Sequence, residues 1–208
     1  MIIQTVLENA SLIFKLQELP TKTFKKNGMR FDISFYQNDD ILISTIDMKA
    51  MLGLMRMDSI IITTPAKDLP VFSMDAIKVM GNKTFLADFY NTLVSQDERT
   101  SDTVLATKFS HLPDFKRESR WYDSILLPNS IAKKNKNLYL EGMASTIFDY
   151  YMDWFNHANE VDPEEKKQKT KEYVDNLLTK GGPSTEQFQK LFGNETTINL
   201  YYELFGVK

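Results

Sequence analysis

The clearest structural signal in the sequence is the alternating run Met29-Arg30-Phe31-Asp32-Ile33-Ser34-Phe35-Tyr36. Large apolar side chains occupy every second position, which is the two-residue period of a half-buried β-strand. The turn signal Asn38-Asp39-Asp40 follows, and residues 41–48 are expected to return as the neighbouring strand. This pair predicts the beginning of an antiparallel sheet.

Three further segments are expected to extend this sheet. Residues 59–64 are apolar and β-branched, and residues 72–80 and 84–90 flank Gly81-Asn82, which is the signal of a tight hairpin turn. Five strands with short connections indicate an antiparallel meander, because parallel neighbours need long crossover connections.

Helical patterns lie before and after these strands. An apolar stripe at helical spacing predicts a helix over residues 2–17, and the strongest helical pattern of the chain covers residues 138–158. After residue 90 the chain is expected to be helical. Strands followed by helices predict an α+β fold, in which residues 1–208 form a single domain. The expected architecture is an α/β/α sandwich with a central antiparallel sheet flanked by helices.

The boundaries of the next helix are marked by its flanking residues. Asp162-Pro163-Glu164-Glu165 supplies an N-cap, a proline at the first helical position and acids at the positive end of the helix dipole. This helix is predicted to run to about Thr179, where Gly181-Gly182-Pro183 ends it. A last helical region is expected around Ile198 and Tyr201.

The composition excludes several classes of protein. The 208 residues include 25 Lys and Arg against 28 Asp and Glu, and a net charge of −3 argues against a general nucleic-acid binder. The absence of Cys excludes disulfides, Cys-ligated metal centres and thiol catalysis. No apolar run approaches the roughly 18 residues of a membrane span. We therefore expect a cytoplasmic protein that uses no nucleic acid and no membrane, and we also expect it to be a monomer.

Two acids stand out in the stretch from Asp58 to Asp75. If the two flanking strands pair with Ile60 opposite Asp75, both acids share one face of the sheet as diagonal neighbours, roughly 7–8 Å apart. Burial would raise the pKa of at least one of them, which suits a proton donor. The alternative is that Asp58 starts its strand in solvent and Asp75 bonds the backbone near a bulge.

A family resemblance adds to this interpretation. The segment Leu69-Pro70-Val71-Phe72-Ser73-Met74-Asp75, followed by Leu86-Ala87-Asp88-Phe89, resembles the ferredoxin-dependent bilin reductases. Near the C-terminus, Tyr173, residues 188–195 and Leu204-Phe205 are similar to the closing pattern of that family, and residues 121–133 match less well. The likeness covers about residues 58–90 and 118–206.

The resemblance implies a reductase of linear tetrapyrroles such as biliverdin. Family members hold the bilin between the sheet and the C-terminal helices, without bound metal or flavin. Electrons arrive singly from an external ferredoxin, and acids of the pocket supply the protons. The motif acid falls on Asp75, which would hydrogen-bond the pyrrole nitrogens or the lactam oxygen and donate a proton. Asp58 is the second catalytic candidate, at a position where family branches carry His or Asn.

Substrate contacts can be assigned in the same way. Lys133 and Lys134 lie where an Arg of the family contacts substrate carboxylates, so they are expected to anchor propionates; the alternative is a solvated loop. Phe72 and Met74, beside the motif acid, are the other expected substrate contacts. An acidic ferredoxin is expected at local positive patches, because local fields steer encounters even at a net charge of −3. The candidate residues are Lys25, Lys26, Lys166, Lys167 and Lys169, and for each of them the alternative is a solvated face.

Two departures from the family pattern keep other functions open. Ser73 replaces the usual Gly, and Gly182-Pro183 stands where several members have Asp-Pro, whose acid is a second proton donor. One alternative is therefore a non-catalytic tetrapyrrole-binding protein with the same fold. Another is a reductase of a different open-chain tetrapyrrole, and a third is a likeness in architecture alone.

Overall fold

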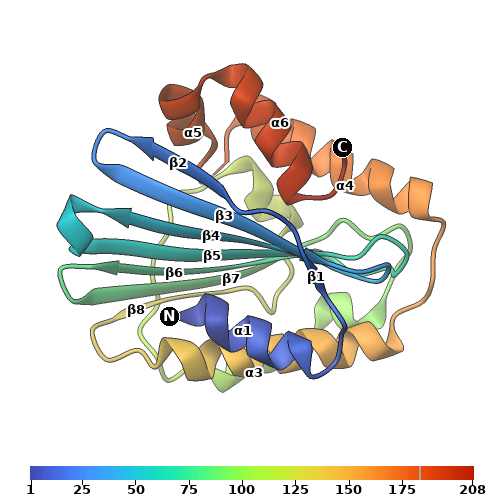
Figure 1. Cartoon of the computed structure of the whole chain (residues 1–208). Coiled ribbons are helices and arrows are strands. Elements are labelled where there is room, and N and C mark those ends of the chain that lie inside the picture. The colour runs from blue at the N-terminus through green and yellow to red at the C-terminus, as the bar shows by residue number, and fades with distance from the viewer. Residues whose placement is uncertain (183) are drawn as a thin grey trace.

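A single antiparallel sheet runs through the middle of the molecule (Figure 1). The computed structural model describes residues 1–182 and 184–208. In this part of the chain the strand order is β1-β3-β4-β5-β6-β7-β8, and β2 pairs beside β1 with β3. The strands are β1 (Gln17–Glu18), β2 (Lys22–Lys26), β3 (Met29–Gln37), β4 (Leu42–Ala50), β5 (Met55–Thr63), β6 (Val71–Val79), β7 (Asn82–Tyr90) and β8 (Ile131–Asn135).

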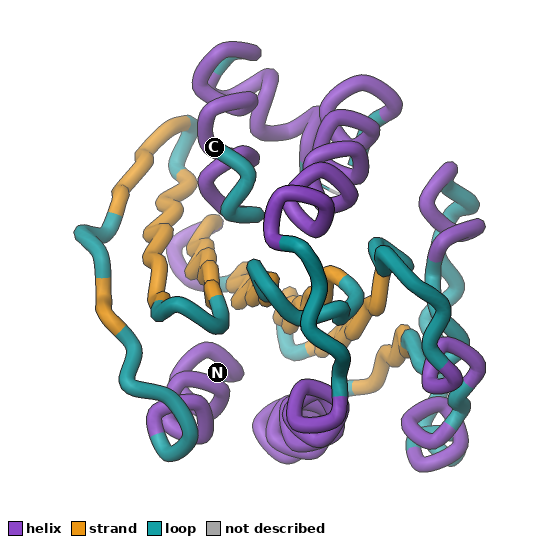
Figure 2. Tube along the Cα trace, turned by 90° about the vertical axis from the view of Figure 1, so that its right-hand side faces the viewer, coloured by secondary structure: helices purple, strands orange, loops and turns teal. Residues whose placement is uncertain are grey.

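Helices cover both faces of this sheet, so the predicted α/β/α sandwich is confirmed. Figure 2 shows α4, α5 and α6 on one side of the strands and α1 and α3 on the other. The helices are α1 (Ile2–Ser11), α2 (Val104–Lys108), α3 (Leu140–His157), α4 (Pro163–Lys180), α5 (Thr185–Phe192) and α6 (Asn194–Leu204), with short 3-10 helices at Met51–Gly53, Glu98–Ser101 and Trp121–Ile125. None of these helices has the length and apolar character needed to cross a bilayer.

The alternation of the strands gives the molecule two hydrophobic cores. Ile43, Ile60 and Phe85 project to the side of α1 and α3, which we call the α3 face. Phe31 and Ile46 project to the side of α4, α5 and α6, which we call the α4 face. Because neighbouring residues of a strand point to opposite faces, the register of each strand decides which core a side chain joins.

Several predicted elements differ from the observed ones. The first helix ends at Ser11 instead of residue 17, and Ile13 is exposed. Strands β1, β2 and β8 were not predicted. The strand β2 is an edge segment of which four of the five residues are exposed, including three lysines, so it lacks the apolar alternation that identified β3. The prediction of helix after residue 90 is wrong at β8, which is short and polar.

The predicted helices at the C-terminal side are confirmed in their main features. Asp162 caps α4 by accepting a hydrogen bond from the amide of Glu165 at 3.0 Å. Gly181 follows the last residue of α4 with a φ of +86°. Pro183, the last residue of the predicted stop signal, lies outside the described residues. Buried Lys166 of α4 donates at 2.9 Å to the carbonyl of Thr92, which ties α4 to the end of the sheet.

Candidate functional site

Asp75 lies in the middle of the sheet and faces α4, α5 and α6. Its direct neighbours across the sheet are Ser59 on β5 and Leu86 on β7. Its carboxylate borders a cavity of about 70 Å³ between the sheet and the C-terminal helices. The cavity walls are mainly aromatic and apolar, with Phe188 and Tyr201 on the helix side. Asp75 is therefore a half-buried acid beside a mainly apolar cavity.

The surroundings of Asp75 favour its protonated form. Burial raises the pKa of Asp75 to about 6, and the negative charge of Asp88 adds to this effect. The hydroxyl of Ser59, which donates a hydrogen bond to Oδ1 of Asp75, and the more distant charge of Arg117 act in the opposite direction. A carboxyl group with a pKa near 6 can both donate and accept a proton near neutral pH.

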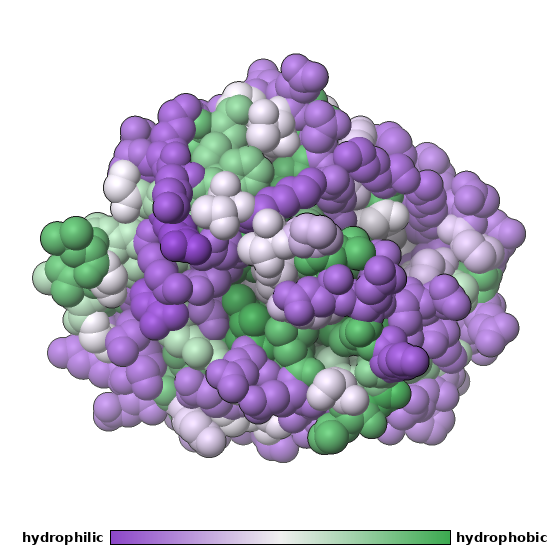
Figure 3. All heavy atoms as spheres, in the orientation of Figure 1, coloured by the Kyte–Doolittle hydropathy of each residue, from purple (hydrophilic) through white to green (hydrophobic). Residues whose placement is uncertain are grey.

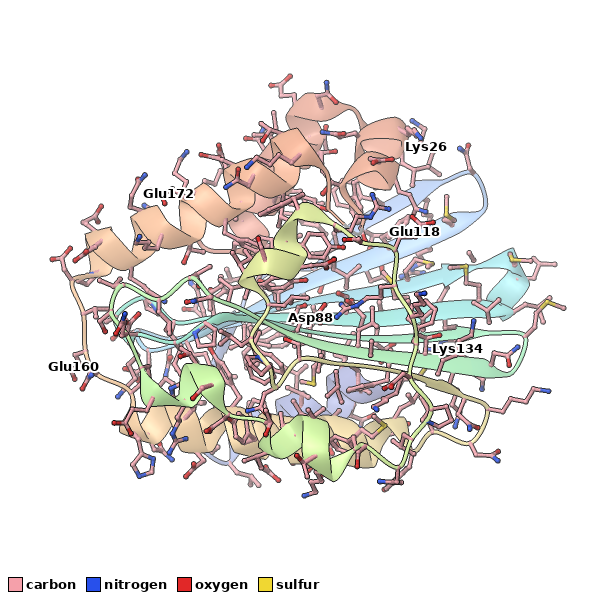
Figure 4. The ribbon with its side chains drawn as sticks, turned by 180° about the vertical axis from the view of Figure 1, so that it is seen from behind. Lys26, Asp88, Glu118, Lys134, Glu160 and Glu172 are labelled. Carbon is pink, nitrogen blue, oxygen red and sulfur yellow. The ribbon has the colours of Figure 1, made fainter. Side chains whose placement is uncertain are left out.

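A second buried acid, Asp88, shares this face of the sheet with Asp75. Asp88 is paired with Ser73 on β6, two residues from Asp75, so the two acids are diagonal neighbours, with backbones roughly 7–8 Å apart. Figure 4 shows Asp88 near the middle of the sheet. Arg117, from the loop before the 3-10 helix at Trp121–Ile125, donates to Oδ2 of Asp88 at 2.6 Å. The site therefore combines a half-buried carboxyl group, that of Asp75, with a buried one, that of Asp88, and with the guanidinium of Arg117.

The other carboxylate oxygen of Asp88 is unusual. Among the described residues, Oδ1 of Asp88 is buried and has no hydrogen-bond partner. Burial raises the pKa of Asp88, and the hydrogen bond from Arg117 opposes this shift. An unsatisfied buried oxygen costs on the order of 1–3 kcal/mol, and a proton or a bound donor group at Oδ1 would remove that cost.

Tyrosine side chains complete the polar part of the site. The hydroxyl of Tyr90 donates to Oδ2 of Asp88 at 3.2 Å, and the rings of Tyr90 and Tyr173 are 4.7 Å apart between centroids. Burial raises the pKa of Tyr201 to about 12, and its hydroxyl lies 3.1 Å from that of Thr185. These phenols stay neutral at physiological pH. The hydroxyl of Tyr90 already donates to Asp88, whereas that of Tyr201 accepts from Thr185 and can donate a hydrogen bond to a ligand.

The predicted pairing of Asp58 with Asp75 is wrong. Ser59, not Ile60, lies opposite Asp75, and this offset of one residue puts Asp58 on the α3 face. There the buried carboxylate of Asp58 accepts a hydrogen bond from the amide of Ile3 at 3.3 Å, at the start of α1. A carboxylate in this place stabilises the positive end of the helix dipole. Burial raises the pKa of Asp58 as well.

Phe72 and Met74 also lie on the α3 face, away from the cavity. Both are fully buried, and Phe72 stacks on Phe89 and Tyr151 with centroid distances of 4.6 and 4.9 Å. The expectation that Phe72 and Met74 flank a ligand together with Asp75 is wrong. They are three residues and one residue away from Asp75, and residues an odd number of positions apart in a strand point to opposite faces of the sheet.

The two predicted carboxylate anchors are separated by the sheet. Lys133 is buried on the α3 face and donates to Oδ1 of Asp114 at 2.6 Å. Lys134 is exposed, and its partner Thr84 on β7 is two residues from Leu86, the partner of Asp75. Lys134 therefore shares the face of Asp75, roughly 12 Å away by the spacing of strands and residues. Figure 4 shows Lys134 toward the end of the sheet at which the β6–β7 turn lies.

The glycine at position 182 has little room for a side chain. A Cβ atom there would lie 2.6 Å from Oγ1 of Thr185 and 2.8 Å from Cδ2 of Leu177. An acid at this position would displace Leu177, so the described arrangement fits the absence of the second family acid. Among the described residues, no group of three potential ligands is placed to hold a metal ion.

Asp88 and Arg117 were not recognised as site residues from the sequence. The available signal was an acid at position 88 within the apolar run Phe85-Leu86-Ala87-Asp88-Phe89-Tyr90, which indicates a buried and therefore partnered carboxylate. Arg117 comes from a loop, and no local pattern connects it with β7. No protein-family model and no curated protein matches this chain, so its function is argued from the site and from the sequence resemblance.

Proposed function

We propose that this chain binds a linear tetrapyrrole between the sheet and the C-terminal helices and reduces it, with Asp75 as the proton donor. The observation that carries the proposal is the half-buried carboxyl group of Asp75, which borders a mainly apolar cavity on the α4 face and has a pKa of about 6. This is the motif acid of the sequence resemblance, and it lies between the two layers that hold the substrate in the similar family.

Reduction of one double bond of a bilin requires two electrons and two protons. The electrons come one at a time from an external donor of the ferredoxin class. Asp75 delivers one proton to the radical formed after the first electron, regains a proton from solvent, and delivers the second proton after the second electron. Asp88, a diagonal neighbour of Asp75, is placed to relay these protons. Arg117 keeps one oxygen of Asp88 occupied and leaves the buried Oδ1 free to take a proton.

The size of the cavity constrains this proposal. Pockets for ligands of drug size measure about 300–1,000 Å³, and the cavity beside Asp75 is about 70 Å³. Substrate entry therefore requires that α5 and the end of α6 move away from the sheet. The short α5 is suited to this, because Gly181 and Gly193 flank it with φ values of +86° and +84°.

The second candidate function is tetrapyrrole binding without reduction. The specific observation in its favour is the crowded position of Gly182, where the proton donor of several similar proteins is missing. This alternative predicts saturable binding of biliverdin and no product with any one-electron donor.

The test is anaerobic mixing of the protein with biliverdin and reduced ferredoxin, followed by visible absorption. We expect the biliverdin bands to be replaced by those of a reduced bilin, with at least a hundredfold slower reaction in Asp75→Asn, since general acid catalysis typically contributes about 10²–10⁴-fold. Asp58→Asn is the matched control, because Asp58 is a buried acid with a raised pKa on the opposite face. Equal rates for wild type and Asp75→Asn would refute the role of Asp75, and binding without product would favour the second candidate.

A further inference from the structure

One end of the sheet concentrates positive charge in a chain whose net charge is −3. The turns β2–β3, β4–β5 and β6–β7 and the end of β8 meet there (Figure 1). We call this the hairpin end and define it as residues 25–30, 49–56, 78–83 and 134–136. These segments hold nine of the 25 Lys and Arg side chains and no Asp or Glu. The acids of the chain therefore lie elsewhere, and the molecule has a positive pole.

Six of these cations form a row across the sheet. They are direct partners in successive strand pairs, from β2 to β7: Lys25, Arg30, Lys49, Arg56, Lys78 and Lys83. With strands about 4.8 Å apart, the row spans roughly 24 Å. Like charges directly opposite each other destabilise a sheet. Acids of the next row relieve part of the repulsion, since Arg30 lies 2.7 Å from Asp32 and Lys49 lies 2.8 Å from Asp47.

Apolar side chains project from the tips beyond this row. Met51, Leu54 and Met80 are 56%, 57% and 72% exposed, and Leu52 is fully exposed. The two turns that carry them are adjacent, because the amide of Met80 donates to the carbonyl of Leu54 at 3.1 Å. Figure 3 shows hydrophobic spheres protruding at the left edge, where Figure 1 places the β4–β5 turn.

The backbone of these tips has a conformation that large side chains rarely adopt. Met51, Leu52 and Met80 have φ values of +52°, +54° and +47°, in the left-handed region that Gly and Asn adopt most easily. Large side chains there are strained, exposed and outside both cores. Their presence is explained if they contact an apolar phase outside the protein.

We propose that the hairpin end binds the surface of an anionic phospholipid bilayer. Met51, Leu52, Leu54 and Met80 would enter the boundary between headgroups and acyl chains, and the cationic row would lie at the level of the phosphates. A bilayer accepts convex apolar tips without a preformed pocket, whereas a protein partner must supply a matching cavity for each of them. The contact is peripheral and needs no spanning helix, and it departs from the sequence-based expectation of a protein without membrane contact.

The test is cosedimentation of the full chain with vesicles of phosphatidylcholine alone or with about 30% phosphatidylserine. We expect binding only to the phosphatidylserine vesicles, weakened by salt. Leu52→Ser with Leu54→Ser should weaken it about tenfold or more, since burial of each leucine contributes to partitioning. Lys25→Glu with Lys78→Glu should weaken it as well. Leu12→Ser with Ile13→Ser is the matched control, because these exposed residues lie at the far end of α1.

Two results would overturn the proposal. One is the absence of wild-type binding to phosphatidylserine vesicles at low salt, together with a complex between the hairpin end and an acidic protein that the same substitutions weaken. The other is unchanged vesicle binding of the Leu52 and Leu54 variant, which would leave only nonspecific attraction of charge. Neither result bears on bilin reduction, which is measured without vesicles.

Discussion

The surroundings of Asp75 suit the proposed proton donor, and they lower the free energy of unfolding near neutral pH. Its ordinary pKa is near 3.8, and in the folded chain burial raises the pKa to about 6. Between about pH 4 and pH 6 the folded state therefore holds more protons on this group than the unfolded state does. The free energy of unfolding must fall as pH rises through this window, because the unfolded state releases the proton first.

We expect Asp75→Asn to remove this dependence. At pH 7 the variant should be more stable than wild type by on the order of 2–3 kcal/mol. At about pH 3, below the ordinary pKa of 3.8, the two should be nearly equal, because the side chain is then largely neutral in the folded and the unfolded state. Urea unfolding at the two pH values measures the difference. Asp88, Arg117 and Tyr201 are present in both proteins, so they enter the difference only through their electrostatic interaction with Asp75. A variant with the same pH dependence as wild type would show that Asp75 does not titrate in this way.

The contacts of single residues are also the part of the structure that the sequence predicts least well. Asp75 was identified from its motif, but its partner was misjudged because the register of β5 and β6 was displaced by one residue. The loop between these strands is long and contains Pro65 and Pro70, so it does not fix the register as a two-residue turn does. Asp88 and Arg117 meet only through the tertiary fold.

At the scale of the elements, α5 covers the cavity and is joined to its neighbours by glycines. It packs on β2 and β3 through aromatic contacts, with Phe192 at 4.9 Å from Phe24 and Phe188 at 5.3 Å from Phe31 between ring centroids. Gly193, between α5 and α6, has φ +84° and ψ 162°. This region of backbone conformation is accessible almost only to glycine.

Gly193→Ala should therefore destabilise the protein by about 1–3 kcal/mol through backbone strain. No described atom lies within 4 Å of the added Cβ, so steric overlap does not contribute. Chemical denaturation measures the change. Ser184→Ala, which places the same residue at the other end of α5 at a φ of −121°, is the control without backbone strain. If Gly193→Ala were as stable as wild type, α5 would not depend on the glycine as described.

Elements with strong patterns were predicted well, and weakly patterned ones were missed. The helix expected over residues 138–158 is α3, and the capped helix from Pro163 is α4. Both have wide apolar faces or complete capping signals. By contrast, β2 and β8 bury few side chains, and their lysines obscured the strand period. Their existence depends on pairing with β3 and β7, which local sequence does not encode.

At the scale of the whole molecule, the order of strands and then helices was sufficient to predict the sandwich. The two cores follow from one sheet that is apolar on both faces, and the helices at each end of the chain cover them. The positive hairpin end was visible only in part, as a cluster of lysines near residues 22–26. The complete row required the registers of six strands. The distribution of charge over the whole molecule therefore depends on strand pairing, which local sequence patterns do not encode.

The most direct test of the account is a titration of the protein with biliverdin, followed by visible absorption at about pH 5 and about pH 8. These values lie on either side of the Asp75 pKa of about 6. The account predicts a saturable shift of the biliverdin bands at both pH values, with a pH dependence that Asp75→Asn abolishes. If biliverdin showed no spectral change with folded wild-type protein at either pH, the cavity beside Asp75 would not be a tetrapyrrole site.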